Sequence, residues 1–110
     1  MDNQRIDPAA TTRTKITDLP EFDVAEWLPD EAAAAEYLTV VMEENDPAAL
    51  AKALGTIARA WGMTEIAAKA GIGREALYKA LRDGASPRYD MISRVFQALG
   101  VKLVAVPQGT

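Results

Sequence analysis

The sequence predicts an all-α fold of five to six short helices, with a short strand near each end of the chain. Hydrophobic residues recur at helical spacing through most of the chain, and glycine or proline separates these stretches. Near both ends, apolar and polar residues alternate instead, which is typical of strands. The 110 residues are enough to enclose a single hydrophobic core.

The composition excludes several classes of function. The 49% hydrophobic and 25% charged residues are typical of globular proteins. The chain contains neither Cys nor His, which excludes disulfides, thiolate metal sites and catalytic triads that need imidazole. We therefore expect a protein that is not an enzyme, with no catalytic residues, no metal, no cofactor and no small-molecule substrate.

No segment of the chain predicts a membrane span. The longest apolar stretch, residues 32–42, is interrupted by Glu36 and falls well short of the ~20 residues that a spanning helix needs. Residues 1–7 lack the apolar core of a signal peptide. We expect a cytoplasmic protein without a membrane partner.

Charge is distributed unequally between the two halves of the chain. Residues 1–55 carry four basic and twelve acidic side chains, a net charge of −8, whereas residues 56–110 carry eight basic and four acidic ones, a net charge of +4. Such asymmetry suggests a polyanion as the partner of the second half and a basic protein as the partner of the first. The alternative is that both surfaces are simply solvated.

The first half is expected to contain a disordered arm and an acidic extension. Residues 1–13 are polar and without periodicity, whereas residues 14–45 form the extension, which opens with a possible short strand at 14–19. A short helix over 21–28, with Asp23 as its N-cap, is followed by a second helix that Asp30 caps and that Asn45 ends.

This extension contains the residues expected to contact a protein partner. Trp27 lies beside other hydrophobic residues and belongs either to the core or to a partner surface, since exposed aromatic side chains often mark interfaces. The predicted partner-binding residues are Phe22, Trp27, Leu28 and Tyr37.

Residues 46–110 are expected to form a DNA-binding domain that ends in a strand. Asp46 and Pro47 open a helix, because Asp is a favoured N-cap and Pro is tolerated at the first helical position. Its buried stripe is predicted to be Leu50, Leu54, Ile57 and Trp61. A later helix, with Ile92, Val95, Phe96 and Leu99 inward, ends at Gly100.

Two short helices joined by a glycine-containing turn indicate a helix-turn-helix. Gly62 ends the preceding helix, Thr64 is expected to cap the first short helix, and Gly71-Ile72-Gly73 joins it to a second one over 74–81. Leu77 and Leu81 form a core pair in that second helix, which leaves its opposite face exposed.

The exposed face of residues 74–81 has the chemistry of a major-groove reader. Arg74 could read guanine, Tyr78 could contact a thymine methyl group or a phosphate, and Lys79 could contact a phosphate or a base. The predicted DNA-binding residues are Thr64, Arg74, Glu75, Tyr78, Lys79, Arg82 and Arg88.

The apolar alternation over residues 101–106 predicts a terminal strand. A lone strand is not stable, so it must pair with residues 14–19, with a symmetry mate or with the sheet edge of a partner protein.

These residues together resemble the addiction-module antidote proteins that carry a phage-repressor-like helix-turn-helix. The resemblance covers about residues 14–106, and its most specific part is the block Arg74-Glu75-Ala76-Leu77-Tyr78-Lys79-Ala80-Leu81. It implies a lambda-repressor-like fold and a type II antitoxin. Such a protein neutralises a basic RelE-like ribonuclease toxin, binds double-stranded operator DNA as a homodimer and represses its own operon.

The sequence departs from that pattern at two positions. Glu65 stands where repressors of this class usually carry Gln, and Gly73 replaces the Ser or Thr that opens the second motif helix. We therefore expect weak DNA binding by the isolated protein, strengthened by the toxin or by dimerisation. The alternatives are a transcriptional regulator without a toxin partner and a protein-binding adaptor that has lost DNA contact.

Overall fold

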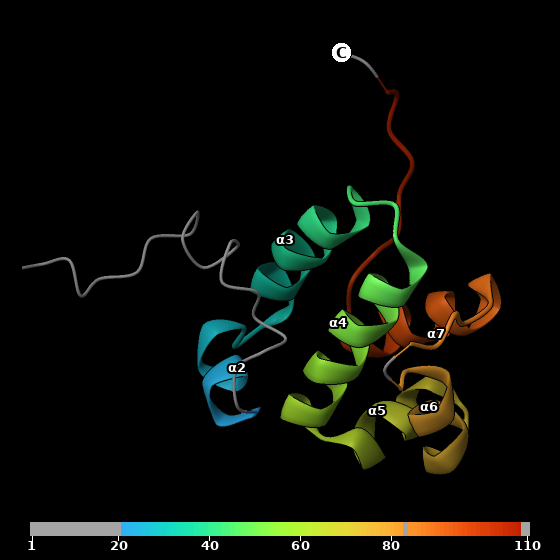
Figure 1. Cartoon of the computed structure of the whole chain (residues 1–110). Helices are drawn as coiled ribbons and strands as arrows, with labels where there is room; N and C mark the ends of the chain where they lie inside the picture. Colours follow the sequence, from blue (N-terminus) through green and yellow to red (C-terminus); the bar gives the residue numbers. More distant parts are fainter. Residues whose placement is uncertain (1–20, 83, 109–110) are drawn as a thin grey trace, which may run out of the picture.

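The protein is all-helical throughout the part of the chain that the structure describes. The computed structural model describes residues 21–82 and 84–108, with side chains from Asp23 onward, and within these ranges it contains no strand. The helices in chain order are α2 (Glu21–Trp27), α3 (Glu31–Met42), α4 (Pro47–Trp61), α5 (Met63–Ala70), α6 (Arg74–Ala80) and α7 (Tyr89–Leu99) (Figure 1). The predicted all-α class is confirmed.

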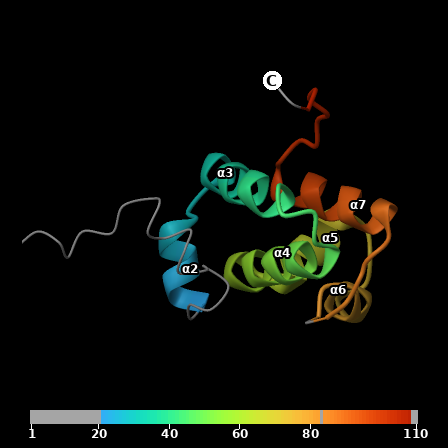
Figure 2. The ribbon, with the colours of Figure 1, turned by 45° about the horizontal axis from the view of Figure 1, so that its top comes forward.

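Helix α4 lies at the centre of the molecule. Helices α2 and α3 pack against it, α5 follows it and packs against α7, and α6 contacts α5 (Figures 1 and 2). The predicted stripe explains this position, because Leu54 and Ile57 are fully buried and Leu50 and Trp61 are half-buried. Burying one fully enclosed aliphatic side chain contributes about 1.5–3 kcal/mol, so α4 is the main anchor of the fold.

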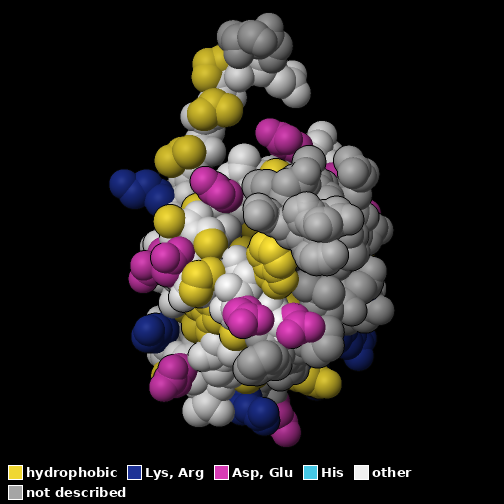
Figure 3. Space-filling model, turned by 90° about the vertical axis from the view of Figure 1, so that its left-hand side faces the viewer, with side chains coloured by type: hydrophobic (Ala, Val, Ile, Leu, Met, Phe, Trp, Pro, Cys, Tyr) yellow, Lys and Arg dark blue, Asp and Glu magenta, His cyan; other side chains and the backbone are white. Residues whose placement is uncertain are grey.

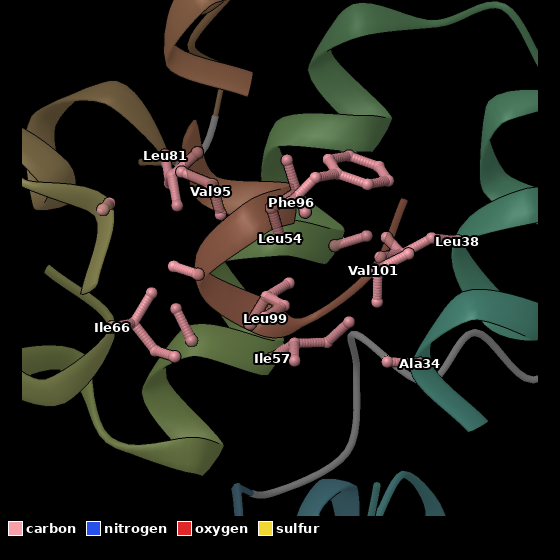
Figure 4. Packing of buried hydrophobic residues seen from close by; sticks show 14 of the residues in the cluster. Ala34, Leu38, Leu54, Ile57, Ile66, Leu81, Val95, Phe96, Leu99 and Val101 are labelled. Atoms are coloured by element: carbon pink, nitrogen blue, oxygen red, sulfur yellow. The ribbon is translucent and has the colours of Figure 1, made fainter. Parts of the chain in front are cut away.

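One hydrophobic core unites the acidic extension with the rest of the chain. Figure 4 shows Val95 and Leu99 of α7 facing Leu54 and Ile57 of α4. Leu38 of α3 closes the core on one side, and the same cluster continues into α2 and α5. The helices of the first half are therefore packed onto the second half rather than tethered to it.

Two of the three predicted aspartate N-caps are confirmed. The carboxylate of Asp30 accepts a hydrogen bond from the Ala33 N–H at 3.0 Å, and that of Asp46 accepts one from the Ala48 N–H at 3.0 Å. The prediction for Asp23 is wrong, because α2 begins at Glu21 and Asp23 lies inside its first turn.

Glycines mark the C-terminal ends of three helices, as the sequence predicted. Gly62 ends α4, Gly71 ends α5 and Gly100 ends α7. The expected cap at Thr64 is wrong. Helix α5 begins at Met63 directly after Gly62, and Thr64 is its second residue, with no side-chain cap at this end of the helix.

The predicted C-terminal strand is not formed. Residues 101–106 run away from α7 without helix or ladder (Figure 1), because no neighbouring strand in the described part of the chain offers backbone partners. The predicted arm at 1–13 and strand at 14–19 lie outside the described residues. Among the helices that the structure describes, none is both long enough and apolar enough to cross a membrane.

Candidate functional site

A tight turn sets α5 and α6 at an angle to one another. Gly71 adopts the left-handed conformation, with φ of 74°, which a residue with a side chain rarely tolerates. The Gly71 N–H donates to the Ala68 carbonyl and the Ile72 N–H to the Ala67 carbonyl, both at 3.1 Å. These bonds satisfy two carbonyls in the last turn of α5, so the turn is held by its own backbone.

Helix α6 is held to the core by its inner side and its C-terminal end. Leu77 and Leu81 are 0% and 1% exposed, as the sequence predicted. Gly55 of α4 lets the backbone of α6 approach closely, since a Cβ atom there would lie 2.8 Å from the Leu81 carbonyl oxygen. No role for Gly55 follows from the sequence, because a glycine within a helical pattern does not reveal what packs against it.

The outer side of α6 collects four of the predicted DNA-binding residues. Arg74, Glu75, Tyr78 and Lys79 are all exposed, and they line an open hollow of about 480 Å³. Tyr78 leaves 58% of its surface exposed although it lies next to the fully buried Leu77. This face therefore combines two cations, a carboxylate and an aromatic ring on one rigid helix.

The remaining predicted DNA-binding residues lie around α6. Thr64 is exposed near the start of α5, and Arg82 is exposed just after α6. Arg88, which precedes α7, lies 3.6 Å from the Asp90 carboxylate, measured from its Nε. Both side chains of this pair are largely exposed, so the pair adds little stability and leaves the guanidinium accessible.

Glu65 is not among the residues that line the hollow on α6. It lines a separate open cleft of about 670 Å³ together with Asp30, Glu31, Trp61 and Lys69. Three carboxylates and one ammonium group give this cleft a negative balance. Within the described residues, no cluster of three or more carboxylates has the arrangement needed to hold a metal ion.

The predicted partner-binding residues differ in exposure. Trp27 on α2 is 40% exposed and Tyr37 on α3 is half-buried. The side chain of Phe22 lies outside those that the structure describes. Leu28 is 4% exposed and packs in the core, so in this structure it offers almost no surface to a partner.

A hydrogen bond that the sequence did not predict joins the two halves of the chain. The indole N–H of Trp61, the last residue of α4, donates to the carbonyl of Leu28 at 2.8 Å. This bond spans 33 residues and fixes the end of α2 against the end of α4. The spacing of Trp61 predicted its inward position, but no sequence pattern indicates which carbonyl it meets.

The comparison with known families identifies the family of this chain. Residues 18–107 match the model of a family described as "probable addiction module antidote protein". The chain belongs to this family. Membership supports an antitoxin role, and an antidote implies a toxin as its partner in general.

A related protein of Haemophilus influenzae is 42% identical over 84 residues, which cover 76% of this chain and 87% of the relative. That relative is named only as an uncharacterized protein. No solved structure matches the chain.

Proposed function

We propose that this antidote-family protein is the antitoxin of a type II module. It binds and neutralises a RelE-like ribonuclease toxin, and it binds operator DNA through a helix-turn-helix formed by α5 and α6. As a dimer it represses its own operon, and it performs no catalysis itself. The observation that carries the DNA-binding part is the outer face of α6, where Arg74, Glu75, Tyr78 and Lys79 lie together.

The shape of α6 suits the major groove of DNA. A groove about 12 Å wide admits one α-helix, and the second helix of such a motif contacts base edges with its N-terminal residues. Arg74 is the first residue of α6 and Glu75 the second. Because Leu77 and Leu81 hold the opposite side in the core, the helix can enter a groove without losing its own packing.

Each exposed group of α6 has a chemical counterpart on DNA. The Arg74 guanidinium has the fork geometry for guanine O6 and N7, and Glu75 can accept a hydrogen bond from cytosine N4. Lys79, with Arg82 and Arg88 beyond the helix, supplies positive charge for phosphates. Glu65 lines a different cleft, so its carboxylate is not part of the face that we propose for base contacts.

The acidic half has the charge for a basic toxin. The sequence contains no Lys or Arg from Ile16 to Ala51, and the same stretch contains ten Asp and Glu residues. In the structure, Glu26, Glu36 and Glu44 are exposed on or beside α2 and α3, and Trp27 adds an exposed aromatic side chain. Such a field accelerates the approach of a basic protein, and aromatic residues are enriched at interface centres.

DNA binding is tested by fluorescence anisotropy with a duplex from the promoter of the chain's own operon. Arg74→Ala should cost about 1–3 kcal/mol and relax sequence preference, because it removes a base contact. Lys79→Ala should lower the slope of log affinity against log salt by about 1, because it removes one phosphate contact.

Lys102→Ala, an exposed lysine on the C-terminal segment, is the matched control and should leave binding unchanged. The proposal for α6 is wrong if the affinity for every duplex is the same in the wild type, Arg74→Ala and Lys79→Ala, or if none of the three proteins binds DNA. A protein that still neutralises toxin would then be the protein-binding adaptor.

Toxin binding is tested by co-expression with the toxin of the module and by growth rescue. Reversing the exposed charges with Glu26→Lys and Glu36→Lys should reduce protection of the cells, because both carboxylates lie in the acidic half. Asp90→Lys reverses an exposed charge on α7 and is the control. Full protection by the double variant, with unchanged binding to the purified toxin, would show that the acidic half is not the toxin surface.

A further inference from the structure

Glu75 is a carboxylate in a basic surrounding. It lines the hollow on α6 together with Arg74, Tyr78 and Lys79, and all four side chains are exposed. Residues 56–110 carry eight basic and four acidic side chains, whereas acidic side chains are prominent on the side of the molecule that carries α2 and α3 (Figure 3). A surface that only attracts phosphates gains nothing from a negative charge, so this attraction does not explain Glu75.

The helix dipole accounts for an acidic residue in the first turn of α6, but not for its direction. Glu75 is the second residue of the helix, where a carboxylate interacts favourably with the N-terminal end of the dipole. Other positions of the first turn would serve the dipole equally well. The buried Leu77 and Leu81 fix the rotation of α6, and this rotation places Glu75 on the outer face.

The four side chains of this face differ in what they can bind on DNA. The guanidinium of Arg74, the ammonium group of Lys79 and the phenol O–H of Tyr78 can each donate to a phosphate as well as to a base. A carboxylate only accepts hydrogen bonds, and phosphates repel it. Glu75 therefore finds no partner on the DNA backbone, and its partner must be an amino group on the edge of a base.

Cytosine is the base that suits the Glu75 carboxylate best. In the major groove, cytosine offers an amino group at N4 and adenine one at N6, whereas guanine and thymine present acceptors. The adenine N6 lies between two acceptors, its own N7 and the O4 of the paired thymine. The cytosine N4 has an acceptor on one side only, the O6 of the paired guanine. A carboxylate is therefore repelled least at cytosine.

Gly73 leaves the start of α6 open to close approach. Its φ is −70°, a value that any residue can adopt, and a Cβ atom there would meet no atom within 4 Å. Neither the turn nor the packing of the described residues therefore requires a glycine at this position. One use of glycine is to let a ligand come close to the backbone, and Gly73 directly precedes Arg74 and Glu75.

We propose that Glu75 determines which DNA sequence α6 binds, by selecting a cytosine whose N4 amino group is free. This role of Glu75 rests on the DNA binding proposed above and adds the base on which that binding depends. At a wrong base, Arg74 can move its guanidinium to a phosphate, whereas Glu75 is left without water and without a donor. N4-methylated cytosine is excluded in the same way, because its methyl group replaces the hydrogen that faces the groove.

Selection from a library of random duplexes tests the choice of base. The full-length wild type should enrich a sequence with cytosine at one fixed position. Glu75→Gln should enrich the same sequence with adenine there, because Gln pairs with adenine N6 and N7. The matched control is Glu65→Gln, the same substitution at an exposed residue of a different cleft. Its affinity can change for all duplexes alike, but the selected base should remain cytosine.

A duplex with N4-methylcytosine at that position tests the contact without any change to the protein. The modified base still pairs with guanine, and its methyl group lies on the major-groove side. We expect the wild type to bind this duplex about 5- to 150-fold more weakly, the range for one lost base contact. Glu75→Ala should bind the modified and unmodified duplexes alike. Fluorescence anisotropy at a single salt concentration measures these affinities.

Two results would overturn this role of Glu75 and leave α6 as the DNA-binding helix. One is that Glu75→Gln selects the wild-type sequence while Arg74→Ala still relaxes it, which would limit Glu75 to the helix dipole. The other is a wild type that binds the methylated duplex as tightly as the unmodified one. A wild type that selects no sequence at all would overturn the DNA binding proposed above together with the role of Glu75.

Discussion

Helix α6 and the C-terminal segment are both exposed, but they differ in what they leave unsatisfied. Helix α6 makes its own helical backbone hydrogen bonds and shows water two cations, a carboxylate and a phenol ring. The segment after Val101 shows water valine side chains, and its backbone makes no hydrogen bond to the other residues that the structure describes. Exposure alone therefore does not identify a partner. The charged face fits a polyanion, whereas the apolar edge fits another strand.

The two regions are also anchored differently. Helix α6 is fixed by Leu77, Leu81 and the close approach of Gly55. The segment is fixed by Val101 and by the half-buried Leu103, and beyond them it has little contact with the core. A rigid helix suits the reading of a groove, whereas a loosely held segment can adjust its register to a partner.

The largest effect is expected from removing the anchor of α6. Leu77→Ala should lower the free energy of unfolding by about 2–5 kcal/mol, because it leaves a cavity at a fully buried site. Leu103→Ala removes the same atoms from a half-buried site and should cost clearly less. Urea denaturation of both variants measures the difference. Equal losses of unfolding free energy would show that α6 and the C-terminal segment are anchored equally well.

An intermediate effect on stability is expected from adding a side chain at Gly55, where α4 and α6 approach closely. Gly55→Ala places a methyl group 2.8 Å from the Leu81 carbonyl oxygen, a backbone atom that can move only with α6. The overpacking cost of about 1–3 kcal/mol should exceed the gain of up to about 1 kcal/mol in helix propensity.

The matched control for this variant is Gly73→Ala, where nothing lies within 4 Å of the added atom. We expect its stability to stay within about 0.5 kcal/mol of the wild type. Thermal unfolding compares the two variants. If Gly55→Ala is the more stable of the two, α6 is not held by close contact at this glycine.

The smallest effect is expected at the other end of the molecule. Val104→Asp should change the unfolding free energy of the monomer by no more than about 0.5 kcal/mol, because its side chain is 69% exposed. The measurement is made at a dilution where only the monomer is present. A loss of several kcal/mol would show that the segment belongs to the core of the monomer.

Local sequence patterns predicted most of the helices and their ends. Leu54 and Ile57 are buried as their spacing required, and Asp30 and Asp46 cap the helices that follow them. These features depend on neighbours within a few turns of the same chain, which is why periodicity and capping preferences are enough to find them.

The errors arose where the outcome depends on residues far away in the sequence. The alternation over 101–106 satisfies the requirement of a strand, but a strand forms only beside another one. The sequence around Leu28 does not distinguish a core position from a partner surface, because its burial depends on the packing of α2 on α4. Thr64 has the chemistry of a cap, yet α5 starts one residue before it.

The residues of the candidate site were predictable from the sequence, but the contact that holds their helix in position was not. The sequence placed Arg74, Glu75, Tyr78 and Lys79 on one face of a helix opposite Leu77, and the structure brings them together there. The contact with Gly55 that sets the position of this helix joins residues 26 positions apart in the sequence, Gly55 and Leu81. No local pattern could indicate it.

The two tryptophans of this chain differ in surroundings, and this gives the protein two distinct optical reporters. The indole of Trp61 is half-buried and bonded to the Leu28 carbonyl, whereas that of Trp27 is 40% open to water. A Trp61→Phe protein would therefore emit from Trp27 alone, and its spectrum should shift to the blue when another molecule covers α2. A Trp27→Phe protein would emit from Trp61 alone and would report whether α2 and α4 stay joined. Fluorescence of the two variants can therefore distinguish the binding of another molecule at α2 from the separation of α2 and α4.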